Sequence, residues 1–384
     1  MQGMNFLTQH ITGIISTYDG SVPLAIYLKG YFKQYPKIGS RDRKAIAEGV
    51  YIYYRSALFL DPETEVLEII RQGYYLCRSS NAFLAHKLGI DPDVTVPADA
   101  YAPEIGVPLS ASVDEAAWLK SHWTQPDVFI RIVQNEGLVL ELLDQNQIPY
   151  EQEDFPARYQ ATYTCIRVPN SAPIDKILFP EDYVIQDRSS QLALLTASGF
   201  WKDRSPAYFW DVCSGAGGKT LQLKHLDPQY HITASDIRKS ILFNLRGRCA
   251  NYGFKGIHTK EIDATNPAAI RKQLGQKQYD VVLCDVPCSG SGTWSRTPEQ
   301  LYFFNAEYFD RFAHLQYPIA VNTIPFIRKG GLLVYITCSV MHHENEGVTE
   351  QLSAHPELRL LHQEIIDGVE HKADTLFTAI FEKL

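Results

Sequence analysis

The chain has 384 residues, 45% of them hydrophobic and 21% charged, which predicts a globular protein of two or three domains. A formal net charge of −8 excludes a generally basic nucleic-acid-binding protein, although it permits a local basic face. No apolar run is long enough to span a bilayer, and residues 1–5 show no basic segment leading into an apolar one, so we expect neither a membrane span nor a secretory signal.

The seven cysteines are expected to be free thiols. None forms a Cys-x-x-Cys pair, and no cluster of His or Cys accompanies Cys284 and Cys288, so no metal site is expected. An odd number of free thiols is typical of a reducing compartment, and we expect a cytoplasmic protein. Ordinary packing is the interpretation for Cys77, Cys165, Cys213, Cys249 and Cys284.

Residues 1 to about 85 are expected to be helical, because apolar side chains recur at helical spacing in 6–15 and 24–32. Ser40 is expected to cap the next helix, whose apolar stripe runs from Ile46 to Tyr54.

Basic residues are concentrated in this helical part. Between positions 29 and 55 the local charge is +5, from Lys29, Lys33, Lys37, Arg41, Arg43, Lys44 and Arg55 against Asp42 and Glu48. Most such clusters are only solvated helical faces. The tyrosines among these charges can stack on unpaired bases, however, which favours a surface that contacts nucleic-acid phosphates.

The composition and the predicted secondary structure change twice after the helical part. Residues 89–125 are rich in Pro, Ala and Asp and predict a linker with one short helix near 113–123. Residues 126–185 predict a small α+β module, with a strand, a helix and a strand at 128–132, 137–146 and 163–168. From 186 onward, strands alternate with helices, which is typical of a parallel, doubly wound α/β sheet.

Three predicted strands in this last part run directly into loops that carry chemistry. Residues 208–210 lead into a glycine-rich loop at 211–220, the run 281–284 leads to Cys288, and the run 332–336 leads to Cys338. Ligands of open α/β sheets bind outside the carboxyl ends of the strands. We therefore expect the loop and both thiols to surround one crevice.

The glycine-rich loop is expected to hold a cofactor through Cys213, Ser214, Gly215, Ala216, Gly217, Gly218 and Lys219. Its spacing does not match the Gly-x-Gly-x-x-Gly of a dinucleotide site, and a Walker A loop would need glycine where Cys213 stands. Asp236 and Asp263 end the next two predicted strands, where carboxylates can hold ribose hydroxyls and an adenine amino group. Such an acid, taken alone, is more often a cap or turn residue. Together the three strand ends favour a nucleoside without a pyrophosphate, such as S-adenosylmethionine.

At these residues the chain resembles the RsmB/NSUN family of S-adenosylmethionine-dependent RNA 5-methylcytosine methyltransferases. The matching segments are Gln-Asp-Arg-Ser-Ser-Gln-Leu at 186–192, the loop 211–220, Asp236, Asp263, Asp-Val-Pro-Cys-Ser-Gly at 285–290 with Gly292, Arg296 and Pro298, Tyr-Ile-Thr-Cys-Ser-Val at 335–340 with Glu-Asn-Glu at 344–346, and the last strand at 376–383. Residues 38–44 with Val50 and Tyr51 are similar to the NusB-like RNA-binding domain of some members.

Two departures from the family pattern are visible. Ser214-Gly215-Ala216 stands where Ala-Ala-Pro is usual, and Ser295 stands where the first of two adjacent arginines is usual, before Arg296. The second departure removes one expected phosphate or base contact.

The resemblance implies both an architecture and a division of catalytic roles. It implies a Rossmann-like domain with a mixed seven-stranded sheet at 186–384, preceded by an all-α NusB-like domain at 1–88, the linker at 89–125 and the α+β module at 126–185. Cys338 is the implied nucleophile, Cys288 resolves the adduct and Asp285 bonds the base and borders the cofactor. Lys219 is implied to orient the pocket.

DNA 5-cytosine methyltransferases use the Pro-Cys thiol as nucleophile, so an exchange of the two cysteine roles is the mechanistic alternative. Trp294, Arg296, Tyr302 and Phe303 follow the Pro-Cys loop and are expected either to form a wall for the target base or simply to pack.

The sequence therefore predicts a monomeric RNA cytosine-5 methyltransferase acting on ribosomal RNA, with transfer RNA as the second substrate. A catalytically silent, RNA-binding assembly factor and a small-molecule methyltransferase are the alternatives from other classes.

Overall fold

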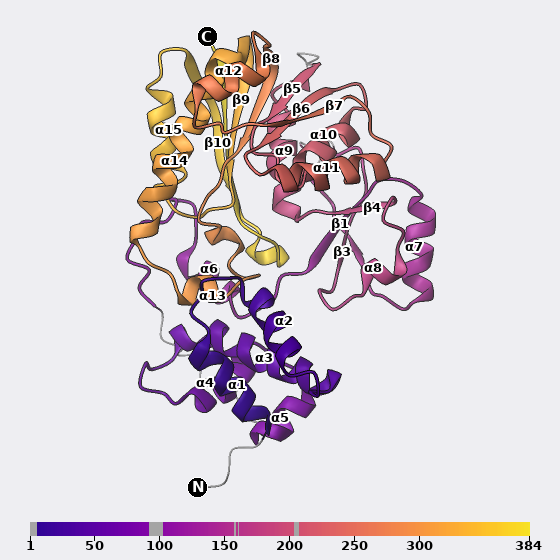
Figure 1. Ribbon diagram of the computed structural model, residues 1–384, viewed down its shortest axis with the longest axis vertical. Helices are drawn as coiled ribbons and strands as arrows, with labels where there is room; N and C mark the ends of the chain where they lie inside the picture. Colours follow the sequence, from indigo (N-terminus) through magenta and orange to yellow (C-terminus); the bar gives the residue numbers. More distant parts are fainter. Residues whose placement is uncertain (1–5, 92–102, 157–158, 160, 203–206) are drawn as a thin grey trace. The chain divides into compact units, whose positions relative to one another are not determined.

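The computed structural model describes residues 6–91, 103–156, 159, 161–202 and 207–384 (Figure 1). The start of the chain and the centre of the predicted linker, at 92–102, lie outside the described residues. The chain packs into two units. One contains Met1–Val107, Asp114–Gln125 and Thr293–Ala306, and the other contains Pro108–Val113, Pro126–Gly292 and Glu307–Leu384.

The first unit is helical, as predicted. Its helices are α1 (Phe6–Thr17), α2 (Leu24–Gln34), α3 (Ser40–Ser56), α4 (Val66–Leu76), α5 (Ala82–Leu88), α6 (Glu115–Ser121) and α13 (Glu299–Tyr302). Leu7 and Ile11 of α1 pack with Ile46 and Val50 of α3 in one apolar core, which explains the helical spacing of these side chains.

The prediction that Ser40 caps α3 is wrong by one residue. Gly39 is the N-cap, in extended backbone and without a side-chain cap bond, and its carbonyl accepts a hydrogen bond from the Arg43 amide at 2.9 Å. Ser40 is the first residue inside the helix. A backbone cap of this kind leaves no side-chain signal in the sequence.

The basic cluster at 29–55 is smaller on the surface than its composition suggests. Lys29, Lys33, Lys37, Arg41 and Lys44 are exposed. Arg55 is instead buried, and its guanidinium donates to the His122 carbonyl and to Gln125 Oε1. Arg55 is therefore a structural residue of the helical unit.

The aromatic residues after the Pro-Cys loop pack in the same unit. Trp294 is 3% exposed and its ring lies 6.1 Å from that of Trp118, while the Tyr302 hydroxyl is 3.1 Å from the Tyr53 hydroxyl. Phe303 contacts the Tyr18 ring at 5.5 Å. Trp294 and Tyr302 thus pack, as the second alternative expects, whereas Phe303 keeps 37% of its surface exposed.

The second unit contains a small antiparallel sheet of order β2-β3-β1-β4. Its elements are β1 (Val128–Ile132), α7 (Glu136–Gln145), β2 (Glu151–Gln152), β3 (Cys165–Val168), α8 (Ile174–Ile177) and β4 (Tyr183–Ile185). Val139 and Leu143 of α7 are fully buried against Ile130 and Ile166 of this sheet. The predicted small α+β arrangement is confirmed.

The larger sheet has seven strands in the order β10-β11-β9-β8-β5-β6-β7. Its strands are β5 (Tyr208–Asp211), β6 (His231–Asp236), β7 (Ile257–Glu261), β8 (Tyr279–Asp285), β9 (Ile327–Thr337), β10 (Leu358–Ile366) and β11 (Leu376–Lys383). The five strands β5 to β9 pair in parallel, whereas β11 pairs antiparallel with both β9 and β10. The predicted mixed, Rossmann-like sheet is confirmed.

Helices cover both faces of this sheet (Figure 1). They are α9 (Arg188–Ser198), α10 (Gly218–Leu226), α11 (Lys239–Asn251), α12 (Pro267–Leu274), α14 (Glu307–Thr323) and α15 (Glu346–Ser353). Val281 and Leu283 of β8 face the side of α9 and α10, and the alternating Val282 and Cys284 face α12, α14 and α15. A strand that is buried on both faces has a continuous run of apolar residues, and this run is what predicts β8 from the sequence. No helix in the described ranges is long and apolar enough to cross a membrane.

A buried arginine connects the small sheet to α10. Arg131 of β1 is fully buried, and its Nη1 donates to His225 Nδ1 at 2.7 Å. The Tyr163 ring stacks on His225 at 5.0 Å and lies 5.3 Å from the guanidinium. Because arginine can only donate, His225 must be the acceptor and therefore neutral. Burial first, and then the Arg131 charge, lower the pKa of His225 to about 4.

We expect acidification to weaken this contact. The folded pKa of about 4 lies below the ordinary value of 6.5, so the stabilisation is complete above pH 6.5 and is lost as the pH falls towards 4. A His225→Gln variant keeps an acceptor for Arg131 but does not titrate in this range. Urea unfolding at about pH 7 and about pH 5 should show a loss of unfolding free energy that is roughly 1–2 kcal/mol larger for the wild type. Equal losses would contradict a neutral, arginine-bound His225.

Candidate active site

A cavity of about 540 Å³ lies at the carboxyl ends of the parallel strands. Its lining residues are Val212, Cys213, Asp236, Ile237, Arg238, Ile262, Asp263, Ala264, Thr265, Asp285, Val286, Pro287, Cys288, Leu315, Ile319 and Cys338. The structure therefore brings together the two thiols and the three strand-end carboxylates that the sequence singled out. Parallel pairing explains this, because it directs the loops after β5, β6, β8 and β9 to one edge.

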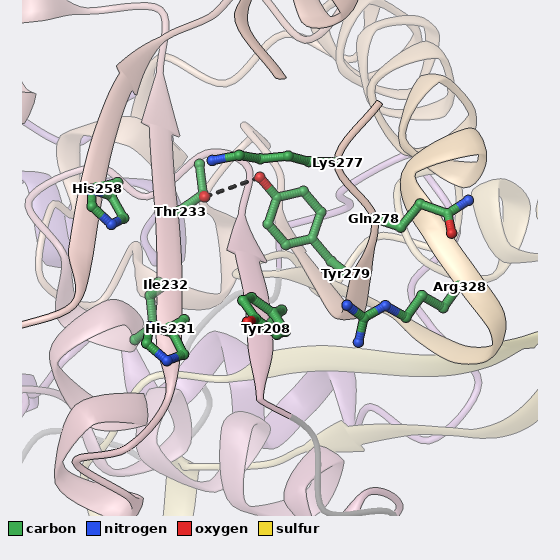
Figure 2. Close-up of a pocket in the computed structure, with 9 residues that line it drawn as sticks. All are labelled: Tyr208, His231, Ile232, Thr233, His258, Lys277, Gln278, Tyr279 and Arg328. Atoms are coloured by element: carbon green, nitrogen blue, oxygen red, sulfur yellow. Dashed lines mark hydrogen bonds between the residues drawn. The ribbon is translucent and has the colours of Figure 1, made fainter. Parts of the chain in front are cut away.

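Figure 2 shows a different pocket, of about 310 Å³, at the opposite edge, where β5, β6 and β8 begin. The Tyr279 hydroxyl points to Thr233 Oγ1 at 2.9 Å, and the Tyr208 ring stacks on His231 with centroids 5.2 Å apart. The nine side chains drawn there include neither a cysteine nor a carboxylate. The reactive groups singled out by the sequence thus gather at the carboxyl edge.

The two thiols face each other across the cavity edge. Cys288 Sγ lies 3.1 Å from Cys338 Sγ, and both side chains are half-buried. The hydrogen bond with Cys338 and then burial raise the pKa of Cys288 well above its usual range. Cys288 therefore remains a thiol near neutral pH in this arrangement.

A glycine behind the pair permits this approach. The Gly292 amide donates to the Cys338 carbonyl at 2.9 Å, and a Cβ at position 292 would stand 1.9 Å from the Thr375 carbonyl oxygen. Any side chain there would clash with backbone, so glycine is required for the Pro-Cys loop to pack against the Cys338 loop.

Lys219, which is buried, and Asp285, which is half-buried, form an ion pair beside the thiols. Lys219 Nζ lies 2.8 Å from Asp285 Oδ2 and 3.2 Å from Ser190 Oγ. Burial, the largest single cause, lowers the pKa of Lys219, but the charge and hydrogen bond of Asp285, together with the charges of Cys338 and Asp211, outweigh it, and the net shift is upward. Lys219 is therefore charged and fixes one oxygen of the carboxylate, whose side chain remains 34% exposed.

The glycine-rich loop depends on glycine for its backbone conformation. Gly215 and Gly217 have φ values of +51° and +88°, and a Cβ on Gly217 would meet Leu245 Cδ1 at 2.1 Å. The Gly215 amide donates to Asp236 Oδ2 at 3.1 Å. Of the loop residues predicted to bind a cofactor, Cys213 lines the cavity, whereas Ser214, Gly215, Ala216, Gly217, Gly218 and Lys219 do not.

The remaining two acids are placed differently. Asp236 is 5% exposed and accepts bonds from Arg238 at its amide, at Nε and at Nη2, so that its pKa is lowered although burial alone would raise it. Asp263 Oδ1 accepts from the Thr265 amide and hydroxyl, at 3.0 and 2.6 Å. Asp263 thus has the turn role that is common for strand-end acids, and it also lines the cavity.

Sequence reasoning missed Arg238 and two apolar lining residues, Leu315 and Ile319. The last two are four positions apart on α14, a spacing that marks one helical face. The spacing of Leu315 and Ile319 predicts a shared helical face, but it does not show that this face lines the cavity.

Residues 202–380 match a family model described as "16S rRNA methyltransferase RsmB/F". The Ribosomal RNA small subunit methyltransferase B of Salmonella paratyphi A is 28% identical over 227 residues, which are 58% of this chain and 49% of that protein. Through this segment the chain is similar to the RsmB/F methyltransferases. The chain spans about half the length of the curated relatives it matches.

Two solved structures share the fold. PH0851 superposes with a TM-score of 0.68 at 18% identity, covering 99% of this chain and 98% of that one. NSun6 from Pyrococcus horikoshii, solved with SFG, gives a TM-score of 0.55 at 16% identity, and the match covers 70% of this chain and 94% of that one. The PH0851 match, which covers nearly the whole chain, shows that this fold recurs in another protein.

RsmB/F methyltransferases depend on S-adenosylmethionine, and the cavity fits such a nucleoside. Arg238 is the one basic residue among the lining side chains, and it is already paired with Asp236 at 3.0 Å. A pyrophosphate would therefore find no unpaired basic side chain among them. Ile237, Ile262 and Ile319 provide apolar surface for a purine.

We expect mild oxidation to join Cys288 and Cys338. Treatment with diamide, which takes up one hydrogen from each thiol, should produce a Cys288–Cys338 disulfide because the sulfurs are already 3.1 Å apart. Peptide mass spectrometry should show this pair oxidised well before the buried Cys165 and Cys284. Preferential oxidation of other cysteines would contradict the observed pairing.

Proposed function

We propose that this protein transfers a methyl group from S-adenosylmethionine to carbon 5 of a cytosine in RNA, through a covalent adduct with Cys338. The supporting observation is the thiol pair at 3.1 Å beside the Lys219–Asp285 ion pair, in a cavity that suits a nucleoside.

Carbon 5 of cytosine is a poor nucleophile, which explains the need for a thiol. Addition of the Cys338 thiolate to carbon 6 makes carbon 5 enamine-like and able to accept a methyl group. When bound, S-adenosylmethionine supplies that methyl. Asp236 and Asp263 would hold its ribose and adenine ends, and Cys213 would border it.

Asp285 is proposed to bond the ring nitrogen or amino group of the cytosine. Its side chain is 34% exposed, and Lys219 holds Oδ2 from behind at 2.8 Å. The other oxygen is thereby oriented to the cavity side, where charge develops on the base as the thiolate adds.

Cys288 is proposed to remove the carbon 5 proton and release the product. The largest cause of its raised pKa is the hydrogen bond with Cys338. That bond is lost once Cys338 is bonded to carbon 6, so Cys288 becomes easier to ionise at the step that needs a base. This order of events favours Cys338 as nucleophile over the exchanged assignment.

Substitution of each cysteine should have opposite consequences for the adduct. Cys288→Ala should accumulate a covalent RNA complex, because the nucleophile remains and the resolving thiol is absent. Cys338→Ala should form no complex and should lose methyl transfer by at least about 10³-fold. Denaturing gels with labelled RNA separate these outcomes. Adduct formation by Cys338→Ala, but not by Cys288→Ala, would reverse the two roles.

Ribosomal RNA is the proposed substrate, in the cytoplasm and with the protein acting as a monomer. The name of the 28% identical relative supports this choice, as do the exposed basic side chains on α2 and α3. Transfer RNA is the second candidate, and the silent assembly factor is disfavoured because both thiols remain paired in the cavity.

Bisulfite sequencing of total RNA from cells with and without this protein tests the substrate. We expect one or a few cytosines in small-subunit ribosomal RNA to lose protection in its absence. Restoration by the wild type, but not by Cys338→Ala, controls for indirect effects. Loss confined to transfer RNA would favour the second candidate, and no loss at all would favour the silent factor.

A further inference from the structure

We propose that Glu344 is a positioning residue whose buried carboxylate ties the Cys288 loop to the Cys338 loop and thereby sets the separation of the two sulfurs. The inference deepens the proposed function, on which its catalytic consequence rests. Its geometric test needs neither RNA nor cofactor.

The carboxylate of Glu344 contacts both cysteine loops directly. Oε1 accepts a hydrogen bond from the Ser289 amide at 2.8 Å, and Oε2 accepts one from the Ser289 hydroxyl at 2.6 Å. Oε2 also accepts a short hydrogen bond from the Ser339 hydroxyl. Ser289 directly follows Cys288, and Ser339 directly follows Cys338. One side chain thus holds the neighbours of both thiols.

Gln316 of α14 supplies a second connection to the same carboxylate. Its Nε2 donates to Glu344 Oε1 at 3.1 Å and to the Pro287 carbonyl at 3.0 Å, on the other side of Cys288. Tyr335 fixes the backbone of Glu344 by donating to its carbonyl at 2.6 Å. The Pro-Cys loop is therefore fixed on both sides of Cys288.

A charge at this position needs an explanation, because Glu344 is fully buried and its carboxylate has no Lys or Arg ion pair within the described ranges. Burying a carboxylate is costly unless its acceptor sites are filled. Here four donors converge on two oxygens, and only a carboxylate can accept at both ends. A neutral amide would turn one acceptor into a donor and disrupt part of the network.

Fixing both loops is valuable when two groups must act in turn on one base. Effective catalysis of this kind requires reacting atoms to be held within a fraction of an ångström of their productive positions. The Glu344 charge is also among the smaller causes of the raised pKa of Cys288, after the Cys338 bond, burial and the Cys338 charge. It therefore favours the protonated form of the resolving thiol before the adduct forms.

The test compares Glu344→Gln with Glu346→Gln under diamide. Glu346 lies two residues away and is half-buried. Its carboxylate accepts from Ser110 Oγ at 2.8 Å and lies 3.5 Å from His342 Nδ1, but it does not bind Ser289 or Ser339, the neighbours of the two cysteines. We expect Glu344→Gln to form the Cys288–Cys338 disulfide about tenfold more slowly than the wild type, and Glu346→Gln to match the wild type. Circular dichroism establishes that each variant is folded. A folded Glu344→Gln that couples its thiols at the wild-type rate would overturn the proposal.

Two further variants keep the test decisive if Glu344→Gln does not fold. Ser289→Ala and Ser339→Ala each remove one hydroxyl from the carboxylate while leaving its charge and the other donors in place. Both should slow disulfide formation in the same direction. Wild-type coupling rates in both would overturn the positioning role.

Methyl transfer provides the second readout. A positioning role predicts that Glu344→Gln lowers kcat by about 10–100-fold while the KM for RNA changes little, since the residue is fully buried. Slow thiol coupling together with a wild-type protein that methylates no RNA would contradict the proposed function and leave the positioning role in place. A Glu344→Gln variant that couples its thiols at the wild-type rate but loses methylation would contradict the positioning role and leave the proposed function in place.

Discussion

The parallel pairing of β8 with β9 is the constraint on which the site depends. Asp285, the last residue of β8, is aligned with Ile336 of β9, so the loops that follow leave the sheet side by side. Cys288 and Cys338 are 50 residues apart in the chain, yet their sulfurs lie 3.1 Å apart. An antiparallel pair would have sent the two loops to opposite edges.

Charged side chains at this edge are stabilised in two different ways. Lys219 lies in the first turn of α10, where the helix dipole disfavours a cation, and Asp285 at 2.8 Å offsets that cost. Glu344 instead receives four hydrogen-bond donors. The first arrangement leaves one carboxylate oxygen available towards the cavity, whereas the second leaves none, which is consistent with a substrate-facing role for Asp285 and a supporting role for Glu344.

The helical unit shows why local patterns mislead about single residues. Arg55 and the exposed Lys44 belong to the same basic run, but the stripe of α3 that faces the core includes position 55. Its guanidinium is satisfied by a carbonyl and an amide from 122–125, which no local pattern predicts. Trp294 and Tyr302 resemble Arg55 in this respect. Their position after a catalytic loop does not show which apolar surface they pack against.

The sequence by itself determined the elements, because apolar period, strand-end glycines and buried apolar runs are properties of contiguous residues. It also identified Cys288, Cys338, Asp285 and the strand-end acids as candidates. The tertiary structure decided which of these meet, since the register of β8 with β9 and the approach of α14 join residues far apart in the chain. Glu344 was visible as part of a motif, but its four bonds come from three separate segments. Only folding brings those donors to one carboxylate.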